Sequence, residues 1–207
     1  MSPTQAALVL LAPFSLLTAD ERLEPPLRFK LSVGNSEQFI KADQPFQIDG
    51  KNALLQASTT RNFKAAGLSF PYPAAFSFES SVGEASPPTF RSWVLSGNDC
   101  KLLIQAFHGK VPLRSYAEKY AASVTGAGSD GPVIKKGTIH LGQKLDSVSI
   151  ATTNLGSRIQ LLLVDLGIQN GWQRILIVQD FPGKTEARSP EAIEAIRLLT
   201  AELATDA

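Results

Sequence analysis

The segment from Arg158 to Phe181 constrains the fold more than any other part of the chain. Two runs rich in apolar and β-branched residues flank the dipeptide Asn170-Gly171. This dipeptide between two strands favours a type I′ turn, because both central residues of that turn need a positive φ. We therefore expect a two-residue β-hairpin in which Gln169 pairs with Trp172.

That register assigns each side chain of the hairpin to one face of a sheet, since successive residues of a strand point to opposite sides. The first expected face is apolar and holds Leu162, Val164, Leu166, Ile168, Ile175 and Ile177. The second expected face is mixed and holds Leu161, Leu163, Asp165, Trp172, Arg174, Leu176 and Val178. The pattern predicts a hairpin at the centre of a sheet, with a helix over the apolar face.

The rest of the chain predicts an α+β fold. We expect strands at 91–95, 100–108, 133–141 and 145–153, and helices at 111–124 and from Ser189 onward. Neighbouring strands joined by short loops indicate an antiparallel sheet of about six to seven strands, flanked by two main helices. The helices can cover one face each or share one, and the hydrophobicity of the central strands on both sides favours one helix on each face.

Both expected helices carry terminal signals and an apolar stripe. Pro112 suits a first turn and Gly126 a C-terminal cap, while Ser189-Pro190-Glu191 supplies an N-cap, a first-turn proline and an acid at the positive end of the helix dipole. Helical spacing predicts these buried stripes: Leu113, Tyr116, Ala117, Tyr120, Ala121 and Val124 in the first helix, and Ala192, Ile193, Ile196, Leu199 and Leu203 in the second.

Residues 20–66 are expected to form an N-terminal β-arm. Arg28 to Val33 is typical of a short strand, and Asp49-Gly50 within Pro45 to Ala57 predicts a second hairpin. After the arm, the prolines between Gly67 and Glu79 favour an extended segment at a sheet edge rather than a central strand.

The apolar run from Ala6 to Ala19 has two interpretations. It is too short to span a bilayer, which needs about 20 apolar residues. Residues 1–19 can be a signal peptide cleaved after Ala19, which implies a periplasmic or extracellular protein. The alternative is an ordinary N-terminal helix of a cytoplasmic protein.

Composition excludes several classes of function. The net charge is +1 over 207 residues, without a block of like charges, so the sequence lacks the cationic surface that nucleic acids and anionic membranes require. The single cysteine, Cys100, excludes an internal disulfide and a cysteine-based metal cluster. Because Cys100 lies in an alternating apolar run, we expect a buried, unreactive thiol.

No catalytic, metal or cofactor site is predicted. Gly126 to Gly131 matches G-x-G-x-x-G, but a helix precedes it and a strand follows, which is the reverse of a dinucleotide site. His108 ends an apolar row, where a hydrogen-bonded core histidine is expected. His140 lies six residues before Asp146 without further ligands at metal spacing, and G-x-S-x-G is absent.

The mixed face of the hairpin offers one candidate binding patch. In the expected register, Asp165 and Arg174 lie diagonally across the strand pair, and Trp172 stands beside them at the turn. The first interpretation is an exposed cross-strand ion pair of little energetic weight. The second is a ligand or partner patch, because Trp and Arg are favoured anchors of interfaces.

The stretch from Gly67 to Leu203 resembles the PsbP-like family. The matching features are Gly67-Leu-Ser-Phe, the Tyr72-Pro73 step, the hairpin that holds Trp93, and the order helix, four strands, helix. The family groups an extrinsic photosystem II protein, a Ran-binding nuclear-import factor and bacterial DcrB-type envelope proteins. The resemblance implies an antiparallel sheet between helices, and a binding or assembly module without catalytic residues.

We therefore expect a non-enzymatic module that binds a protein partner, without a cofactor, a nucleic acid or a transmembrane span. The alternative from another class is a small hydrolase or ligand-binding enzyme that pairs His108 or His140 with a carboxylate.

Overall fold

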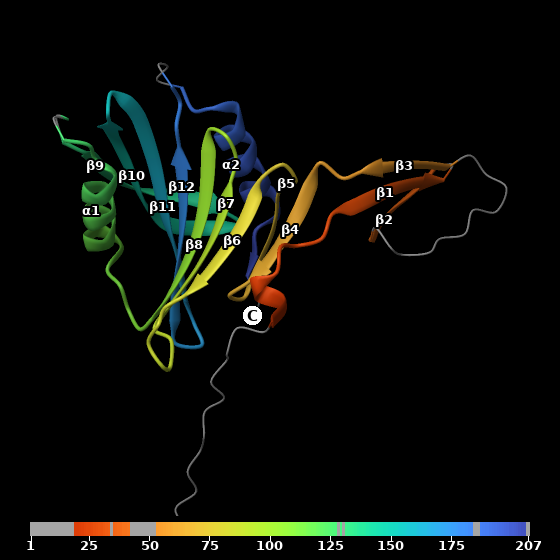
Figure 1. Cartoon of the computed structure of the whole chain (residues 1–207), viewed down its shortest axis with the longest axis horizontal. Helices are drawn as coiled ribbons and strands as arrows, with labels where there is room; N and C mark the ends of the chain where they lie inside the picture. Colours follow the sequence, from red (N-terminus) through yellow and green to blue (C-terminus); the bar gives the residue numbers. More distant parts are fainter. Residues whose placement is uncertain are drawn as a thin grey trace, which may run out of the picture.

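The body of the protein is a seven-stranded antiparallel sheet (Figure 1). The computed structural model describes residues 19–33, 35–41, 53–127, 129, 131–183 and 187–205. The sheet has the order β6-β7-β8-β12-β11-β10-β9. Its strands are β6 (Ser77–Val82), β7 (Phe90–Ser96), β8 (Cys100–His108), β9 (Val133–Leu141), β10 (Gln143–Asn154), β11 (Ser157–Gln169) and β12 (Trp172–Asp180). The expected α+β class and antiparallel sheet are confirmed.

The helix α1 (Leu113–Val124) covers one face of the sheet over β10 and β11. The predicted stripe is confirmed, because Ala117 and Ala121 are buried and the other four members pack around them. The hydroxyl groups of Tyr116 and Tyr120 donate hydrogen bonds to glutamine side chains of the sheet. The C-cap is Thr125 rather than Gly126: Thr125 donates to the Ala121 carbonyl through its backbone N (2.9 Å) and its hydroxyl (2.7 Å).

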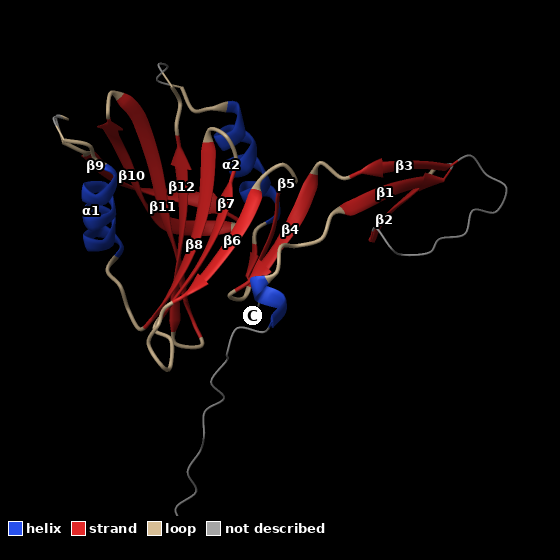
Figure 2. Cartoon of the chain, in the orientation of Figure 1, coloured by secondary structure: helices blue, strands red, loops and turns tan. Residues whose placement is uncertain are grey.

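The helix α2 (Pro190–Glu202) lies on the opposite face, so each face carries one helix (Figure 2). Ser189 is the N-cap, as expected, and accepts a hydrogen bond from Ala192 N at 3.1 Å. Glu191 reaches the turn between β7 and β8, where its carboxylate accepts hydrogen bonds from the backbone N atoms of residues 98–100. The acid thus fixes a neighbouring turn to the start of the helix.

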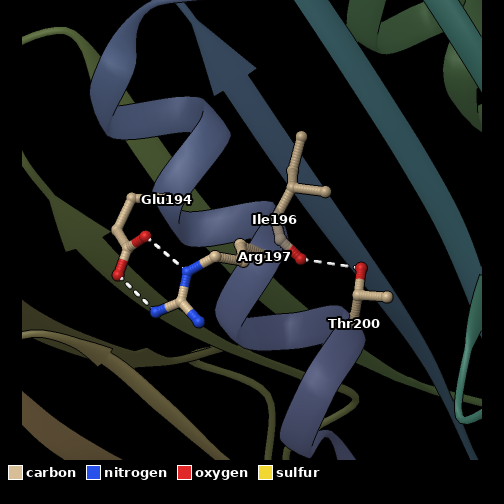
Figure 3. A network of polar contacts seen from close by, with 4 residues as sticks. All are labelled: Glu194, Ile196, Arg197 and Thr200. Atoms are coloured by element: carbon tan, nitrogen blue, oxygen red, sulfur yellow. Dashed lines mark hydrogen bonds and ion pairs between the residues drawn. The ribbon is translucent and has the colours of Figure 1, made fainter.

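The predicted stripe of α2 is wrong at one position, since Ile193 is 57% exposed. The buried residues are Ala192, Ala195, Leu198 and Leu199. The small alanines allow a close approach of the helix to the sheet, which turns Ile193 outward. The outer side is polar, and Glu194 and Arg197 form two contacts of 2.7 Å there (Figure 3).

A second, smaller sheet packs beside α2 over the same face. It has the order β13-β5-β4, with β4 (Thr60–Ala65), β5 (Leu68–Pro73) and β13 (Ala204–Thr205). The sequence predicted an edge strand, yet β5 is central. Its prolines are tolerated because β13 pairs only with Leu68 and Ser69, so the proline half of β5 has a partner on one side alone.

The N-terminal arm is a separate three-stranded sheet that projects from the body (Figure 1). Its order is β2-β1-β3, with β1 (Arg28–Val33), β2 (Ser36–Lys41) and β3 (Ala53–Ala57). The strand β1 was expected and β2 was not. The expected turn at Asp49-Gly50 lies outside the described residues, as does the run from Ala6 to Ala19 except Ala19 itself, which begins a short 3₁₀ helix (Ala19–Arg22). Among the described residues, every helix is too short or too polar to cross a membrane.

The central hairpin has the expected turn but not the expected register. Asn170 and Gly171 have φ angles of 51° and 78°, and Gln169 pairs with Trp172. A β-bulge then inserts one extra residue into β11, so that Ile168 faces Gln173 but Asp165 faces Ile175. Gly167, at φ 79°, adopts the left-handed conformation that the bulge needs.

The bulge exchanges the faces of half the hairpin. Leu162, Val164 and Leu166 lie with Leu176 and Val178 in the core under α2. Leu161 and Leu163 lie with Ile175 and Ile177 in the core under α1. The predicted grouping of Leu162, Val164 and Leu166 with Ile175 and Ile177 is therefore wrong, because a shift of one residue moves a side chain to the other face.

Gly167→Ala should lower the free energy of unfolding by about 1–2 kcal/mol, the cost of a left-handed conformation for an L-residue. A Cβ at this position meets nothing within 4 Å, so the loss comes from the backbone alone. The matched control is Gly137→Ala in β9, where φ is not positive and the new Cβ lies 3.5 Å from Ser147 Oγ. That variant should be neutral or slightly more stable. Urea denaturation measures both, and equal losses would contradict the role given to the bulge.

Cys100 should resist thiol reagents in the native protein. The side chain is fully buried, and burial, with the nearby carboxylates of Asp180 and Glu191, raises the pKa of its thiol from 9.0 to about 12. At pH 8 we expect iodoacetamide to label it only after denaturation, as measured by intact mass. Rapid labelling of the folded chain would show that this end of the sheet opens readily.

Candidate interaction surface

The guanidinium of Arg174 forms hydrogen bonds that connect the smaller sheet to the main sheet. Arg174 is 5% exposed and lies on the α2 face of β12. Its Nη1 donates to the carbonyl oxygens of Ala66 and Gly67 (both 3.3 Å) and to Gln169 Oε1 (2.6 Å). Its Nη2 donates to the Leu166 carbonyl in the bulge at 3.1 Å. One side chain thus joins the turn between β4 and β5 to both strands of the central hairpin.

Asp165 lies on the opposite face from Arg174, because of the bulge. Its carboxylate accepts hydrogen bonds from Gly167 N at 2.9 Å and from Gln173 Nε2 at 3.0 Å. Gln173 is 2% exposed and in turn accepts a hydrogen bond from Val111 N, just before α1. Asp165 therefore stabilises the bulge and the approach to α1, and the predicted diagonal contact with Arg174 is wrong.

Trp172 shares the face of Arg174 and is half-buried at the end of β12. The guanidinium carbon of Arg91 lies 4.4 Å from the centroid of its ring, a cation–π geometry. The ring of His108 meets it edge-on at 5.6 Å. Of the three residues of the predicted patch, the structure thus brings Trp172 and Arg174 to one face and places Asp165 on the other. Binding by any of them stays a prediction.

The two histidines lie far apart on the main sheet. His108 is exposed at the end of β8, although a core position was expected, and His140 is exposed near the end of β9. Three strands lie between β8 and β9 in the sheet. At the usual strand spacing, the axes of β8 and β9 are therefore about 19 Å apart. Within the described residues neither histidine forms an ion pair with a carboxylate, and no group of three metal-ligating side chains occurs.

The arm presents the surface least explained by the needs of the fold. In the described strand pairs, one side carries Leu31 and Ile40, which are 1% and 6% exposed. The other side carries the Lys30–Glu37 ion pair, at 2.8 Å, beside Phe39, which is 61% exposed. A large aromatic side chain between charged neighbours on a projecting sheet is typical of an interface anchor.

Within the described residues, the order β2-β1-β3 leaves the outer edges of the arm unpaired. Among the described strands β2 and β3 each pair only with β1, so each presents one row of backbone N–H and C=O groups outward. An open edge is a template for an added strand, which is why proteins usually shorten or cover it. The arm can therefore offer both an exposed aromatic ring and a strand edge.

The base of the arm is fixed firmly to the body. Glu24 forms an ion pair with Arg61, and Arg61 Nη1 donates to the Pro25 carbonyl at 3.5 Å. The Glu21 carbonyl accepts a hydrogen bond of 3.0 Å from the indole of Trp93, which is fully buried in the core. A pocket of about 260 Å³ lies beside this junction, between residues 21–26 and β4. These contacts attach the base of the arm to the body.

Arg174→Met should destabilise the protein by about 2–4 kcal/mol, since it leaves several buried carbonyl oxygens without charged donors. Arg174→Lys keeps the charge but loses the planar fork, so we expect an intermediate loss. The comparison variant is Asp165→Asn, which keeps an acceptor for Gly167 N and should cost about 1 kcal/mol or less. Guanidinium denaturation ranks the three, and a larger loss at Asp165 would contradict the assigned roles.

Comparison of the chain with models of known protein families gave no match, and comparison with curated protein sequences gave none. The function is therefore inferred from the geometry of the chain itself.

Proposed function

We propose that the protein is a non-enzymatic binding or assembly module that engages a protein partner through the N-terminal arm. The observation that carries this proposal is the arm itself: a three-stranded sheet that projects from the body, with Phe39 exposed and, among the described strands, both outer edges unpaired. Burial of the exposed Phe39 ring against a partner would be stabilising, because burial of apolar area is the main stabilising term.

The chemistry of the arm favours a partner that adds a strand. Backbone hydrogen bonds to an open edge supply affinity, and side chains next to that edge supply specificity. On the described surface of β2 those side chains include Phe39 and Glu37, which a partner strand with an apolar residue and a base would complement. The Lys30–Glu37 pair is exposed, so its rearrangement costs little.

The body supports the proposal through its resemblance to the PsbP-like family. We propose that residues 67–203 form a PsbP-like sandwich, on the order of elements and the helix on each face of the sheet. An exported protein would present the arm to periplasmic or extracellular partners. The alternative of a hydrolase that pairs His108 or His140 with a carboxylate has no specific support, since among the described residues neither histidine forms an ion pair with a carboxylate.

The test is photo-crosslinking in the native host, with a photoreactive phenylalanine analogue replacing Phe39. We expect an adduct with a protein at this position. The control replaces Leu155, which is 92% exposed at the turn between β10 and β11, on the body rather than the arm. No adduct should form there.

A second experiment compares the variants Phe39→Ser and Leu155→Ser. Both side chains are exposed, so each variant should lose about 0.5 kcal/mol of stability or less. Phe39→Ser should abolish recovery of the crosslinked partner by affinity capture, and Leu155→Ser should leave it unchanged. Equal recovery with both variants would refute binding through the arm.

A further inference from the structure

The helix α2 leaves one corner of the main sheet open. It begins next to the end of β12, where Ser189 N donates to both oxygens of Asp180 at 3.3 Å. It ends near the turn between β9 and β10, where a Cβ at Gly142 would lie 3.6 Å from the Leu203 carbonyl. The strand pairing aligns Asp180, Gln160, Ala151 and Val133 in one row across the sheet. The start of β9 therefore lies at the same end of the sheet as the start of α2, but three strands away, and α2 crosses diagonally past it.

A pocket of about 240 Å³ occupies this corner. Its floor is formed by two neighbouring rows of the sheet, one with Val133 and Ala151 and the next with Lys135 and Ser149. Arg188, from the connection between β12 and α2, also lines it. Four separate segments of the chain, β9, β10, β11 and the connection that holds Arg188, thus meet around one small concavity.

The lining of the pocket is cationic. Lys135 and Arg188 both line it, whereas the described residues of the lining include neither Asp nor Glu. Within the described part of the chain neither cation has a hydrogen bond or an ion pair. Asp180, in the cross-strand row of Val133, is 2% exposed, and its carboxylate accepts hydrogen bonds from Ser189 N. Two cations that line one cavity repel each other, and an anion between them would remove that repulsion.

We propose that this pocket binds the phosphate group of a small phosphate monoester. A guanidinium presents a planar fork that matches phosphate oxygens, an ammonium adds a point charge, and the hydroxyl of Ser149 can donate a further hydrogen bond. A phosphate monoester carries a charge of about −1.5 to −2 at neutral pH, which matches the two cations. The apolar side chains on this face of the lining, Val133 and Ala151, suit a small uncharged remainder of the ligand.

The size of the pocket limits the ligand. Pockets for drug-sized ligands usually measure about 300–1,000 Å³, so this one holds a small molecule or only the phosphate end of a larger one. The site is independent of the arm, which is built from other residues. Failure of one proposal therefore leaves the other intact.

The test titrates the full chain with inorganic phosphate and with glycerol phosphate at neutral pH and low ionic strength. Isothermal calorimetry should show saturable binding, and both ligands should raise the thermal midpoint of unfolding. Lys135→Gln and Arg188→Gln should each weaken binding by about tenfold or more, because each removes one charge-assisted contact.

The matched control is Lys136→Gln, which removes the same charge from the neighbouring residue on the opposite face of β9. It should bind phosphate as the unaltered chain does. Because Lys135 is exposed and Arg188 half-exposed, all three variants should fold, and their thermal midpoints without ligand verify this. Equal weakening by Lys136→Gln would overturn the site, as would the absence of saturation at millimolar phosphate. Acetate binding as tight as phosphate binding would overturn the assignment to a phosphate group.

Discussion

The one-residue bulge at Gly167 decides how the rest of the structure is assembled. Without it, Arg174 and Asp165 would share one side of the hairpin. With it, Arg174 turns toward the face of α2, where it holds the β4–β5 turn, and Asp165 turns toward the face of α1, where it holds Gln173. A single left-handed glycine thus gives each layer of the protein its own polar anchor to the central hairpin.

The contacts of Arg174 and Asp165 matter because different elements of the chain cover the two faces of the sheet. The α1 face is covered by one amphipathic helix, whose main contacts are with β10 and β11. On the opposite face α2 shares the cover with the smaller sheet, which packs there through Phe63 and Phe70, whose rings stack 4.9 Å apart beside Trp93. A hydrophobic interface of this kind has little directionality, so the guanidinium of Arg174 and its carbonyl acceptors fix its register.

The sequence predicted those features that depend on local patterns. Alternation, turn dipeptides and capping residues located the seven-stranded sheet's later strands, both helices and the type I′ turn. The bulge was missed because alternating residues were counted from the turn, on the assumption that no residue was inserted in either strand. Gly167, a glycine within an apolar strand, was the available signal for a bulge. The partners of Arg174 could not be predicted at all, since Ala66 and Gly67 lie more than 100 residues away in the chain. The helical stripe failed at Ile193 because the side chains that the sheet accommodates decide the rotation of the helix.

The contrast between body and arm follows from the same physics. In the body, the strands of the main sheet pack apolar side chains against a second layer, and the buried Gln173 and Arg174 side chains form hydrogen bonds with that layer. In the arm, the described strands form one layer with Phe39 turned outward, while the contacts of Glu21, Glu24 and Arg61 hold its base rigidly on the core. A rigid base lowers the entropy that a projecting sheet loses when a partner binds, so the firmly held junction is itself a reason to place the interface on the arm.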